Sequence, residues 1–239
     1  PSVPARAPLP GGAHATAGRR APGRSAIRVR AERGHNAHVS RSVYVASPEG
    51  LTGKSAVALG LLDALVREVG SVGVFRPLTT VHAHPDAGER DLIVELLVSQ
   101  PGVEQTYDEA IGVTYDLARE NPDEALHEIV DRFGRLADRF DVVLVLGSDY
   151  TDVSTGTELS FNAKIAANLG SPVVLVVHGR DRTPAQAQAA AESALTELRA
   201  NHAATVAIIA NRVEPDDLDA VRAALDDVSD LEVGYPERW

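Results

Sequence analysis

The segment of residues 47–60, SPEGLTGKSAVALG, carries the side chains in this sequence that are best suited to bind phosphate. It places Gly50, Gly53, Lys54 and Ser55 where an apolar run gives way to helical periodicity. Backbone N–H groups at a helix start attract anions, a lysine reaches phosphate oxygens, and a serine hydroxyl can hold Mg²⁺. These four residues are therefore candidates for a nucleotide or phosphate site, with Ser55 as a candidate magnesium ligand.

The spacing of this segment differs from the common phosphate loop, GxxxxGK followed by Ser or Thr. Where that loop has its first glycine this chain has Pro48, which lacks an N–H donor, and Glu49 adds negative charge where a phosphate would lie. Lys54 is nevertheless one of only two lysines beside 21 arginines, and a lysine suits phosphate as a compact point charge. Two interpretations stay open: the loop binds phosphate, or it only turns the chain.

Arginines follow two other apolar runs. Arg76 lies at the end of residues 71–77, where a guanidinium could neutralise a terminal phosphate or a substrate carboxylate. Arg180 and Arg182 follow residues 172–179 and could likewise bind an anion. The alternative for Arg76 is an ordinary arginine on the solvated surface. The loop that contains Arg180 and Arg182 is also explained as a helix start, with Thr183 as the cap and Pro184 as the first helical residue.

An acid and an amide lie at the ends of the remaining apolar runs. Asp149 comes just after residues 141–147, where a carboxylate could bind Mg²⁺ directly or through water, and Asp152 and Glu158 are alternatives to it. Asn211 offers two donors and an acceptor, which suits the edge of a purine base. Each of these could instead be a turn residue.

The elements that must position these residues alternate along the chain from residue 42 onward. The predicted strands are residues 42–47, 71–77, 141–147, 172–179 and 205–213, with the start of a sixth at 231–237. The predicted helices are residues 54–69, 90–98, 122–140, 158–170, 184–201 and 215–228, while residues 101–121 have no clear assignment. Strands that are apolar throughout and separated by helices indicate an α/β fold, a three-layer α/β/α domain with a mostly parallel sheet. Ligands bind such a sheet beyond the carboxyl ends of its strands.

Charge divides the chain into two parts. Residues 1–41 contain eight arginines and the single acid Glu32, whereas residues 42–239 are acidic enough to bring the whole chain to a net charge of −11. The first part lacks apolar periodicity and is expected to be disordered, either as a nucleic-acid-binding arm or transit peptide, or as a plain tail or translated upstream sequence. Residues 42–239 are expected to form one domain whose last part is truncated. Their acidity disfavours a nucleic-acid surface.

Composition excludes several classes of site. Cysteine is absent, so disulfides and thiolate metal sites are excluded, and the eight histidines show no HExxH spacing. No run approaches the roughly 20 apolar residues of a membrane span. A cytoplasmic protein with no membrane and no nucleic-acid partner is expected. Because methionine is also absent, even at the start, the chain is expected to be a fragment.

The order of these features resembles a known family. An apolar strand, GxxGKS, FRP, VVLVLG, NAKIAANLGSPVVLV and IIANRV follow one another as in the P-loop NTPase-like domain of dethiobiotin synthetases. The same domain lies at the N-terminus of long bacterial phosphate acetyltransferases, and residues 42–239 look closest to that version. The resemblance implies a parent enzyme of acetate metabolism that interconverts acetyl-CoA and phosphate with acetyl phosphate and CoA. Its catalytic domain, which would bind CoA, would lie C-terminal to this chain, and this part would serve regulation and homo-oligomer assembly.

The resemblance carries over to individual positions. Gly53, Lys54 and Ser55 match the phosphate loop, so ATP with Mg²⁺ is a possible ligand of a regulatory domain. Arg76 stands in place of a phosphate-facing lysine, and Asn211 matches the position that contacts the nucleotide base. No catalytic residue for acetyl transfer is expected in this segment.

The chain also departs from the dethiobiotin synthetase pattern. The sequence Gly147-Ser148-Asp149 replaces the Glu-Gly motif of those enzymes, which weakens the case for ligation of CO₂ to a diamine. Two alternatives to the phosphate acetyltransferase hypothesis remain. The chain could be a stand-alone ATP-dependent ligase or ATPase, or a non-catalytic oligomerisation module with a vestigial nucleotide loop.

Overall fold

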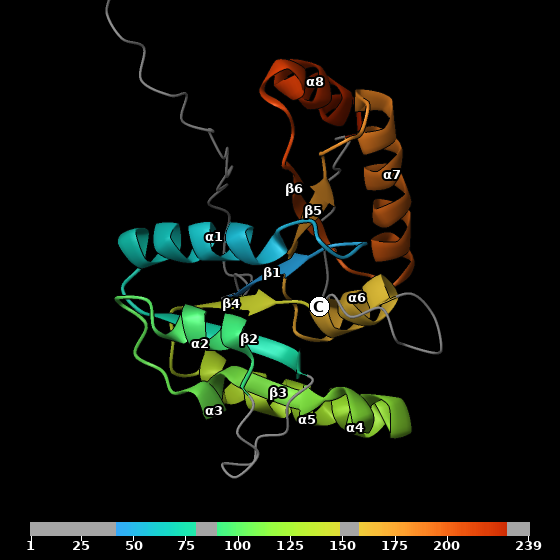
Figure 1. Ribbon diagram of the computed structural model, residues 1–239. Helices are drawn as coiled ribbons and strands as arrows, with labels where there is room; N and C mark the ends of the chain where they lie inside the picture. The colour runs from blue at the N-terminus through green and yellow to red at the C-terminus, as the bar shows by residue number, and fades with distance from the viewer. Residues whose placement is uncertain (1–41, 80–89, 149–157, 229–239) are drawn as a thin grey trace, which may run out of the picture. The chain divides into compact units, whose positions relative to one another are not determined.

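The sheet has six strands, all paired in parallel, in the order β3-β2-β4-β1-β5-β6 (Figure 1). The computed structural model describes residues 42–79, 90–148 and 158–228. The strands are β1 (Ser42–Ala46), β2 (Val72–Thr79), β3 (Ile111–Thr114), β4 (Val142–Leu146), β5 (Val173–His178) and β6 (Thr205–Asn211). The prediction of an α/β fold with a parallel sheet is confirmed, and β1 lies near the centre between β4 and β5.

Helices lie on both faces of this sheet, which gives three layers (Figure 1). They are α1 (Lys54–Glu68), α2 (Leu92–Val98), α3 (Tyr107–Ala110), α4 (Tyr115–Glu120), α5 (Pro122–Ala137), α6 (Glu158–Asn168), α7 (Pro184–Ala200), η1 (Pro215–Asp217) and α8 (Leu218–Val228). The six predicted helices are present with small shifts at their ends.

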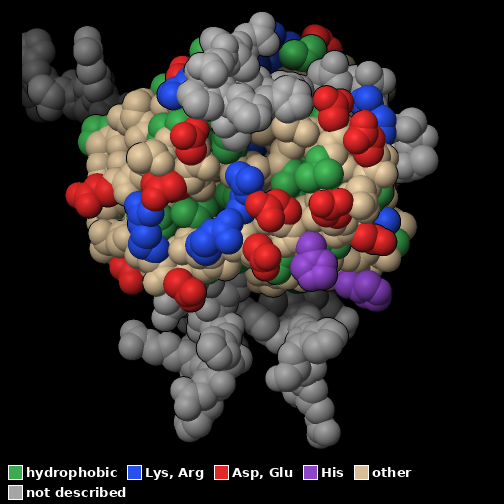
Figure 2. Space-filling model, turned by 90° about the horizontal axis from the view of Figure 1, so that it is seen from below, with side chains coloured by type: hydrophobic (Ala, Val, Ile, Leu, Met, Phe, Trp, Pro, Cys, Tyr) green, Lys and Arg blue, Asp and Glu red, His purple; other side chains and the backbone are tan. Residues whose placement is uncertain are grey.

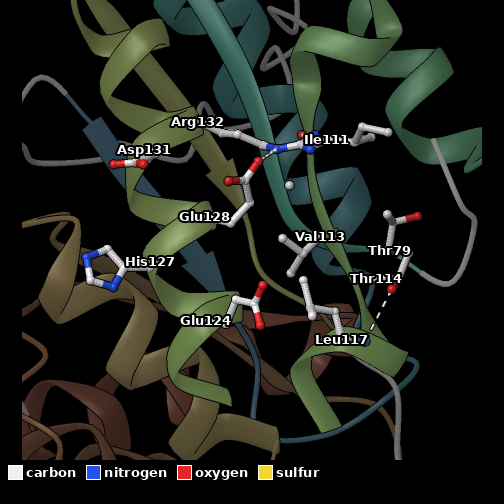
Figure 3. Close-up of a pocket in the computed structure, with 11 residues that line it drawn as sticks. Thr79, Ile111, Val113, Thr114, Leu117, Glu124, His127, Glu128, Asp131 and Arg132 are labelled. Carbon is white, nitrogen blue, oxygen red and sulfur yellow. Dashed lines mark hydrogen bonds and ion pairs between the residues drawn. The ribbon is translucent and has the colours of Figure 1, made fainter. Parts of the chain in front are cut away.

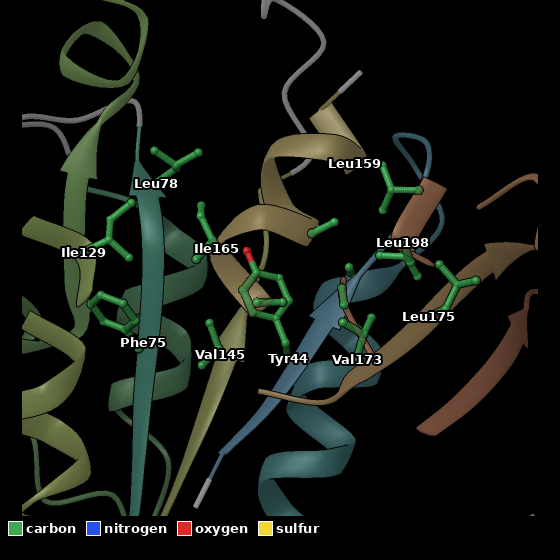
Figure 4. Packing of buried hydrophobic residues seen from close by; sticks show 14 of the residues in the cluster. Tyr44, Phe75, Leu78, Ile129, Val145, Leu159, Ile165, Val173, Leu175 and Leu198 are labelled. Atoms are coloured by element: carbon green, nitrogen blue, oxygen red, sulfur yellow. The ribbon is translucent and has the colours of Figure 1, made fainter. Parts of the chain in front are cut away.

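Two hydrophobic clusters separate the layers, because neighbouring residues of a strand point to opposite faces of the sheet. Helices α1 and α2 cover one cluster, whose strand residues include Val45, Val74, Leu144, Leu146 and Val176. Helices α5, α6 and α7 cover the other, whose strand residues include Tyr44, Phe75, Val145, Val173 and Leu175 (Figure 4). Burial on both faces explains why these strands are apolar throughout.

Hydrogen-bonding side chains set the starts of the helices. Asn121 accepts a hydrogen bond from the Glu124 N–H ahead of α5, and the predicted cap Thr183 forms a capping box with Gln186 at α7. Asp91 caps α2 by accepting from the N–H groups of the second and third residues after it. Such caps satisfy donors that a helix cannot pair internally.

The segment without a sequence assignment supplies the edge of the sheet. Between α3 and α4 the four residues of β3 pair with β2, with Ile111 opposite Arg76. At Gly112 the backbone passes so close to Pro77 that any Cβ would collide with its carbonyl oxygen. A strand of four residues is too short to show a period of two, which is why the sequence pattern missed it. The sixth strand predicted at residues 231–237 lies outside the described residues.

The chain entering β3 is secured by Glu109, whose carboxylate is hydrogen-bonded by Arg139 and by the Thr106 N–H. The hydrogen bond from Arg139, supported by Thr106, lowers the pKa of Glu109 to about 2. A carboxyl whose pKa is lower in the folded chain stabilises the fold above its unfolded pKa, and this contribution disappears as the pH falls through the folded pKa.

We therefore expect Glu109→Gln to lower the free energy of unfolding at neutral pH by less than about 1 kcal/mol, since the pair is largely exposed. The difference from the parent chain should shrink below pH ~4.5 and vanish near pH ~2. Urea denaturation followed by circular dichroism at a series of pH values measures this. Glu120→Gln, at an exposed position of α4, is the control and should change little at any pH; a difference for Glu109→Gln that is constant with pH would contradict the expectation.

Candidate functional site

The loop between β1 and α1 adopts a conformation that requires glycine at its end. Gly53 has φ of 78° and is the N-cap of α1, so it offers no side chain to the N–H groups of the first helical turn. A Cβ on Gly53 would also collide with the side-chain amide of Asn211. Leu51, at φ of 60°, is 83% exposed. The loop therefore enters α1 without a capping side chain, while the Ala56 and Val57 N–H groups donate to the Gly53 carbonyl. Phosphate binding by Gly50, Gly53 and the residues after them stays a prediction.

Lys54 is the first residue of α1 and is only 2% exposed. Its ammonium donates a hydrogen bond to the carbonyl of Gly147, at the carboxyl end of β4. A buried ammonium is stable only with such partners. The structure thus places the predicted phosphate-binding lysine at the carboxyl edge of the sheet, between β1 and β4, and Ser55 half-buried beside it in the first turn of α1.

Glu49 is bound by the chain itself. Its two carboxylate oxygens accept hydrogen bonds from Arg182, at 2.6 and 2.7 Å, and one of them also accepts from the His178 N–H at 3.4 Å. Arg182 was predicted as an anion ligand, and the anion that it contacts in the structure is this carboxylate. Arg180, the second arginine of that loop, is exposed.

The end of β6 contacts the same loop from the other side. The Asn211 amide donates to the Thr52 carbonyl at 2.7 Å, so this predicted base-binding residue braces the loop. A Cβ on Gly53 would lie 3.4 Å from Nε of Arg212, which places that guanidinium over the loop. Arg212 follows Asn211 directly at the end of the same apolar run, but a role was predicted for Asn211 alone; the φ of Arg212 is 63°.

Arg76 is buried in β2 at 9% exposure and is therefore not a solvated surface arginine. Its Nε lies 2.7 Å from Oδ2 of Asp91, the cap of α2. Because an ion pair neutralises most of the field of each partner, Arg76 has less charge to offer a phosphate than the sequence suggested.

A buried polar cluster adjoins the Lys54 contact. Tyr44 donates from Oη to Oδ1 of Asn162 at 2.6 Å, and the Ser148 N–H donates to the same oxygen at 3.0 Å. Tyr115 donates to Glu158 at 3.0 Å. Burial raises the pKa of Tyr44 and of Tyr115 above the usual tyrosine value, so both hydroxyls stay protonated as donors. The sequence contains no motif that would have joined these residues from four separate segments.

The magnesium prediction concerns two residues, Ser55 and Asp149. Asp149 lies outside the described residues, as does its alternative Asp152. Glu158, the other alternative, accepts the hydrogen bond from Tyr115. Within the parts of the chain that the structure describes, no group of three or more His, Asp or Glu side chains is placed to hold a metal ion.

The fold and the loop together define a class. A parallel three-layer α/β domain whose first strand runs through a Gly-Lys-Ser turn into a helix is a P-loop type domain. A family model described as an AAA domain, AAA_26, matches residues 41–233, and the chain belongs to this family.

Two relatives carry the same name. The chain is 28% identical over 193 residues to the phosphate acetyltransferase of Synechocystis sp., a match that covers 79% of this chain and 27% of the relative. It is 32% identical over 149 residues to the phosphate acetyltransferase of Nitratidesulfovibrio vulgaris, covering 60% of this chain and 21% of that protein. The matched part of the chain therefore corresponds to about a quarter of the length of these relatives.

Among solved structures, the BceF tyrosine kinase domain aligns with a TM-score of 0.47 and 18% identity, over 73% of this chain and 69% of that domain. In the described parts of the chain, no helix is both long and apolar enough to span a membrane.

Gly53→Ala tests the loop geometry. The substitution should lower the free energy of unfolding by about 1–2 kcal/mol, because alanine is strained in the left-handed conformation of residue 53. The collision of its Cβ with Asn211 should lower the free energy of unfolding further. The control is Gly60→Ala in α1, where a Cβ meets nothing within 4 Å. That change should stabilise the chain by about 0.5–1 kcal/mol, because alanine is the better helix former. Chemical denaturation of both variants measures this, and equal stability of the two would contradict the assigned role of Gly53.

Proposed function

We propose that this chain is a regulatory and assembly part of a phosphate acetyltransferase, which interconverts acetyl-CoA and phosphate with acetyl phosphate and CoA. The residues that transfer the acetyl group, and those that bind CoA, then lie outside this chain. Support comes from the name shared by two relatives and from the short share of their length that the chain covers. The parent enzyme is expected in the cytoplasm as a homo-oligomer.

The chemistry of the described site supports a binding role. Its charged groups are suited to bind an anion: Lys54 and the first turn of α1 at one end of the loop, and Arg182 and Arg212 around it. The observation that carries the proposal is the burial of Lys54. This residue is 2% exposed, and its ammonium donates a hydrogen bond to the Gly147 carbonyl. A lysine placed in this way binds a phosphate when the loop rearranges, which suits a sensor.

The ligand that fits this site is a nucleoside triphosphate with Mg²⁺. The N–H groups after Gly53 would hold phosphate oxygens, Lys54 would add charge, and the Ser55 hydroxyl would be a magnesium ligand. The bound ion would neutralise phosphate charge. The negative charge of the Glu49 carboxylate repels the phosphates of such a ligand.

Acetyl transfer provides the first test. The purified chain should release no CoA from acetyl-CoA and phosphate, measured with a thiol reagent, while the phosphate acetyltransferase of Synechocystis sp. serves as the positive control. Phosphate-dependent release of CoA by the chain itself would show that the assignment of roles is wrong.

Calorimetric titration with MgATP provides the second test. Binding should weaken about tenfold or more in Lys54→Ala, the loss expected for one charge-assisted hydrogen bond. Lys164→Ala, which removes the exposed second lysine of the sequence, is the matched control and should bind as the parent does. Glu49→Gln should bind MgATP more tightly than the parent chain, because it removes negative charge from the loop.

The outcomes separate the alternatives. No heat with MgATP, together with oligomerisation that depends on this chain, would favour a non-catalytic assembly module. Release of phosphate from ATP that is lost in Lys54→Ala would favour a stand-alone ligase or ATPase. Weaker binding by Glu49→Gln would mean that its ion pair with Arg182 holds the loop in a binding conformation.

A further inference from the structure

A groove of about 450 Å³ runs along β3, far along the sheet from β5 and β6 (Figure 3). The residues of β3 form one side, and five side chains of α5 line the other: Glu124, His127, Glu128, Asp131 and Arg132. Figure 2 views the molecule from the side of α4 and α5 and shows many acidic side chains with a few basic ones and histidines on this face. In the described parts of the chain β3 is the last strand at this end of the sheet, with β2 on one edge and the groove on the other.

Backbone groups of β3 point into this groove. In the pairing of β3 with β2, Ile111 lies opposite Arg76, and the next residue of β2 is Pro77, which has no N–H to donate to the Ile111 carbonyl. That carbonyl instead accepts a hydrogen bond from Nη1 of Arg132 across the groove, at 3.4 Å. Because alternate residues of a strand direct their backbone groups to the same side, the N–H and C=O of Val113 also face the groove. The outer edge of β3 therefore offers the backbone N–H and C=O groups of Ile111 and Val113 as hydrogen-bond partners for an added strand.

The charge of the groove selects what can bind there. Positions 124, 127, 128, 131 and 132 share one face of α5, which adjoins the buried face that contains Ile129. Three of the five side chains are carboxylates and one is a guanidinium, and Arg132 is already paired with Glu128 at 2.7 Å. Glu124 and Asp131 are both exposed, so they leave the groove net negative.

A second copy of this chain is a poor occupant of the groove. Pairing β3 with β3 of another copy would bring the same carboxylates of both chains together, and like charges that face each other across a sheet edge are unfavourable. An extended segment with lysine or arginine at every second position matches the charge, because alternate side chains of an added strand share one face.

We propose that the groove between β3 and α5 binds an extended, basic polypeptide segment, which adds to the sheet as a seventh strand beside β3. Backbone hydrogen bonds to Ile111 and Val113 supply affinity that does not depend on sequence, and the carboxylates of α5 select lysine and arginine. Arg132 gives up its contact with the Ile111 carbonyl to the added strand. This interaction surface is separate from the loop that contains Lys54 and does not depend on its ligand.

The test uses a fluorescent hexapeptide in which lysine and valine alternate, and a matched peptide with glutamate for each lysine. The lysine peptide should bind the full chain at least about tenfold more tightly in fluorescence anisotropy. In ¹⁵N-labelled chain it should slow hydrogen exchange of the Val113 amide by about tenfold or more, which surface attraction without strand addition would not do. Equal binding of the two peptides, or binding without protection of Val113, overturns the proposal.

Two variants test the two sources of recognition separately. Val113→Pro removes the outward N–H, at an edge position where proline is tolerated, and should weaken binding of the lysine peptide about tenfold. The charge-reversed double variant Glu124→Lys, Asp131→Lys alters exposed side chains and should make the glutamate peptide the tighter ligand. It keeps the proposal testable if Val113→Pro does not fold. Unchanged preference in the double variant overturns the proposal, as does an oligomer that dissociates in Val113→Pro, which would mean that β3 pairs with a second copy.

Discussion

The hydrogen bond from the Lys54 ammonium to the Gly147 carbonyl joins the first turn of α1 to the carboxyl end of β4. Burying a charged group is costly unless it is hydrogen-bonded, so this contact requires the loop to close over the lysine and the end of β4 to lie within its reach. Gly147 must also lack a side chain, for a steric reason. A Cβ there would lie 2.7 Å from both Oδ1 of Asn162 and Cε1 of Tyr44. The buried polar cluster and the position of α1 therefore depend on one another through a single backbone position.

The loop above this contact is braced by charges that belong to the chain. Arg182 and the His178 N–H hold the Glu49 carboxylate, and Asn211 holds the Thr52 carbonyl. These contacts come from residues at and after the ends of β5, which lies beside β1 in the sheet, and of β6, which lies beyond β5. Arg182 and the His178 N–H are therefore already engaged by an internal carboxylate, with which the proposed anionic ligand would compete. The proposed sensor role follows from this competition between the Glu49 carboxylate and the anion, because a small change in the charge of the ligand changes which of the two is bound.

Long, strongly patterned elements could be predicted from the sequence, whereas short elements and long-range polar contacts could not. The five strands with continuous apolar runs and the helix start at Thr183 were predictable from local patterns. β3 was not, because four residues that include Gly112 show no period, and its place at the sheet edge comes from pairing with β2. The bidentate contact between Glu49 and Arg182 joins residues 133 positions apart, which no spacing rule connects.

The sequence by itself determined the fold class and the location of the candidate site, because apolar periodicity and a Gly-Lys-Ser turn are local properties. Only the tertiary structure decided how the charged groups are used. In the folded chain Arg76 forms an ion pair with Asp91, and the Lys54 ammonium donates to the Gly147 carbonyl. Arg182 donates to the carboxylate of Glu49. It also opened one edge of β3 to a groove lined by α5. Electrostatic partners are set by distance in space, and the order of strands in the sheet determines which distant residues become neighbours.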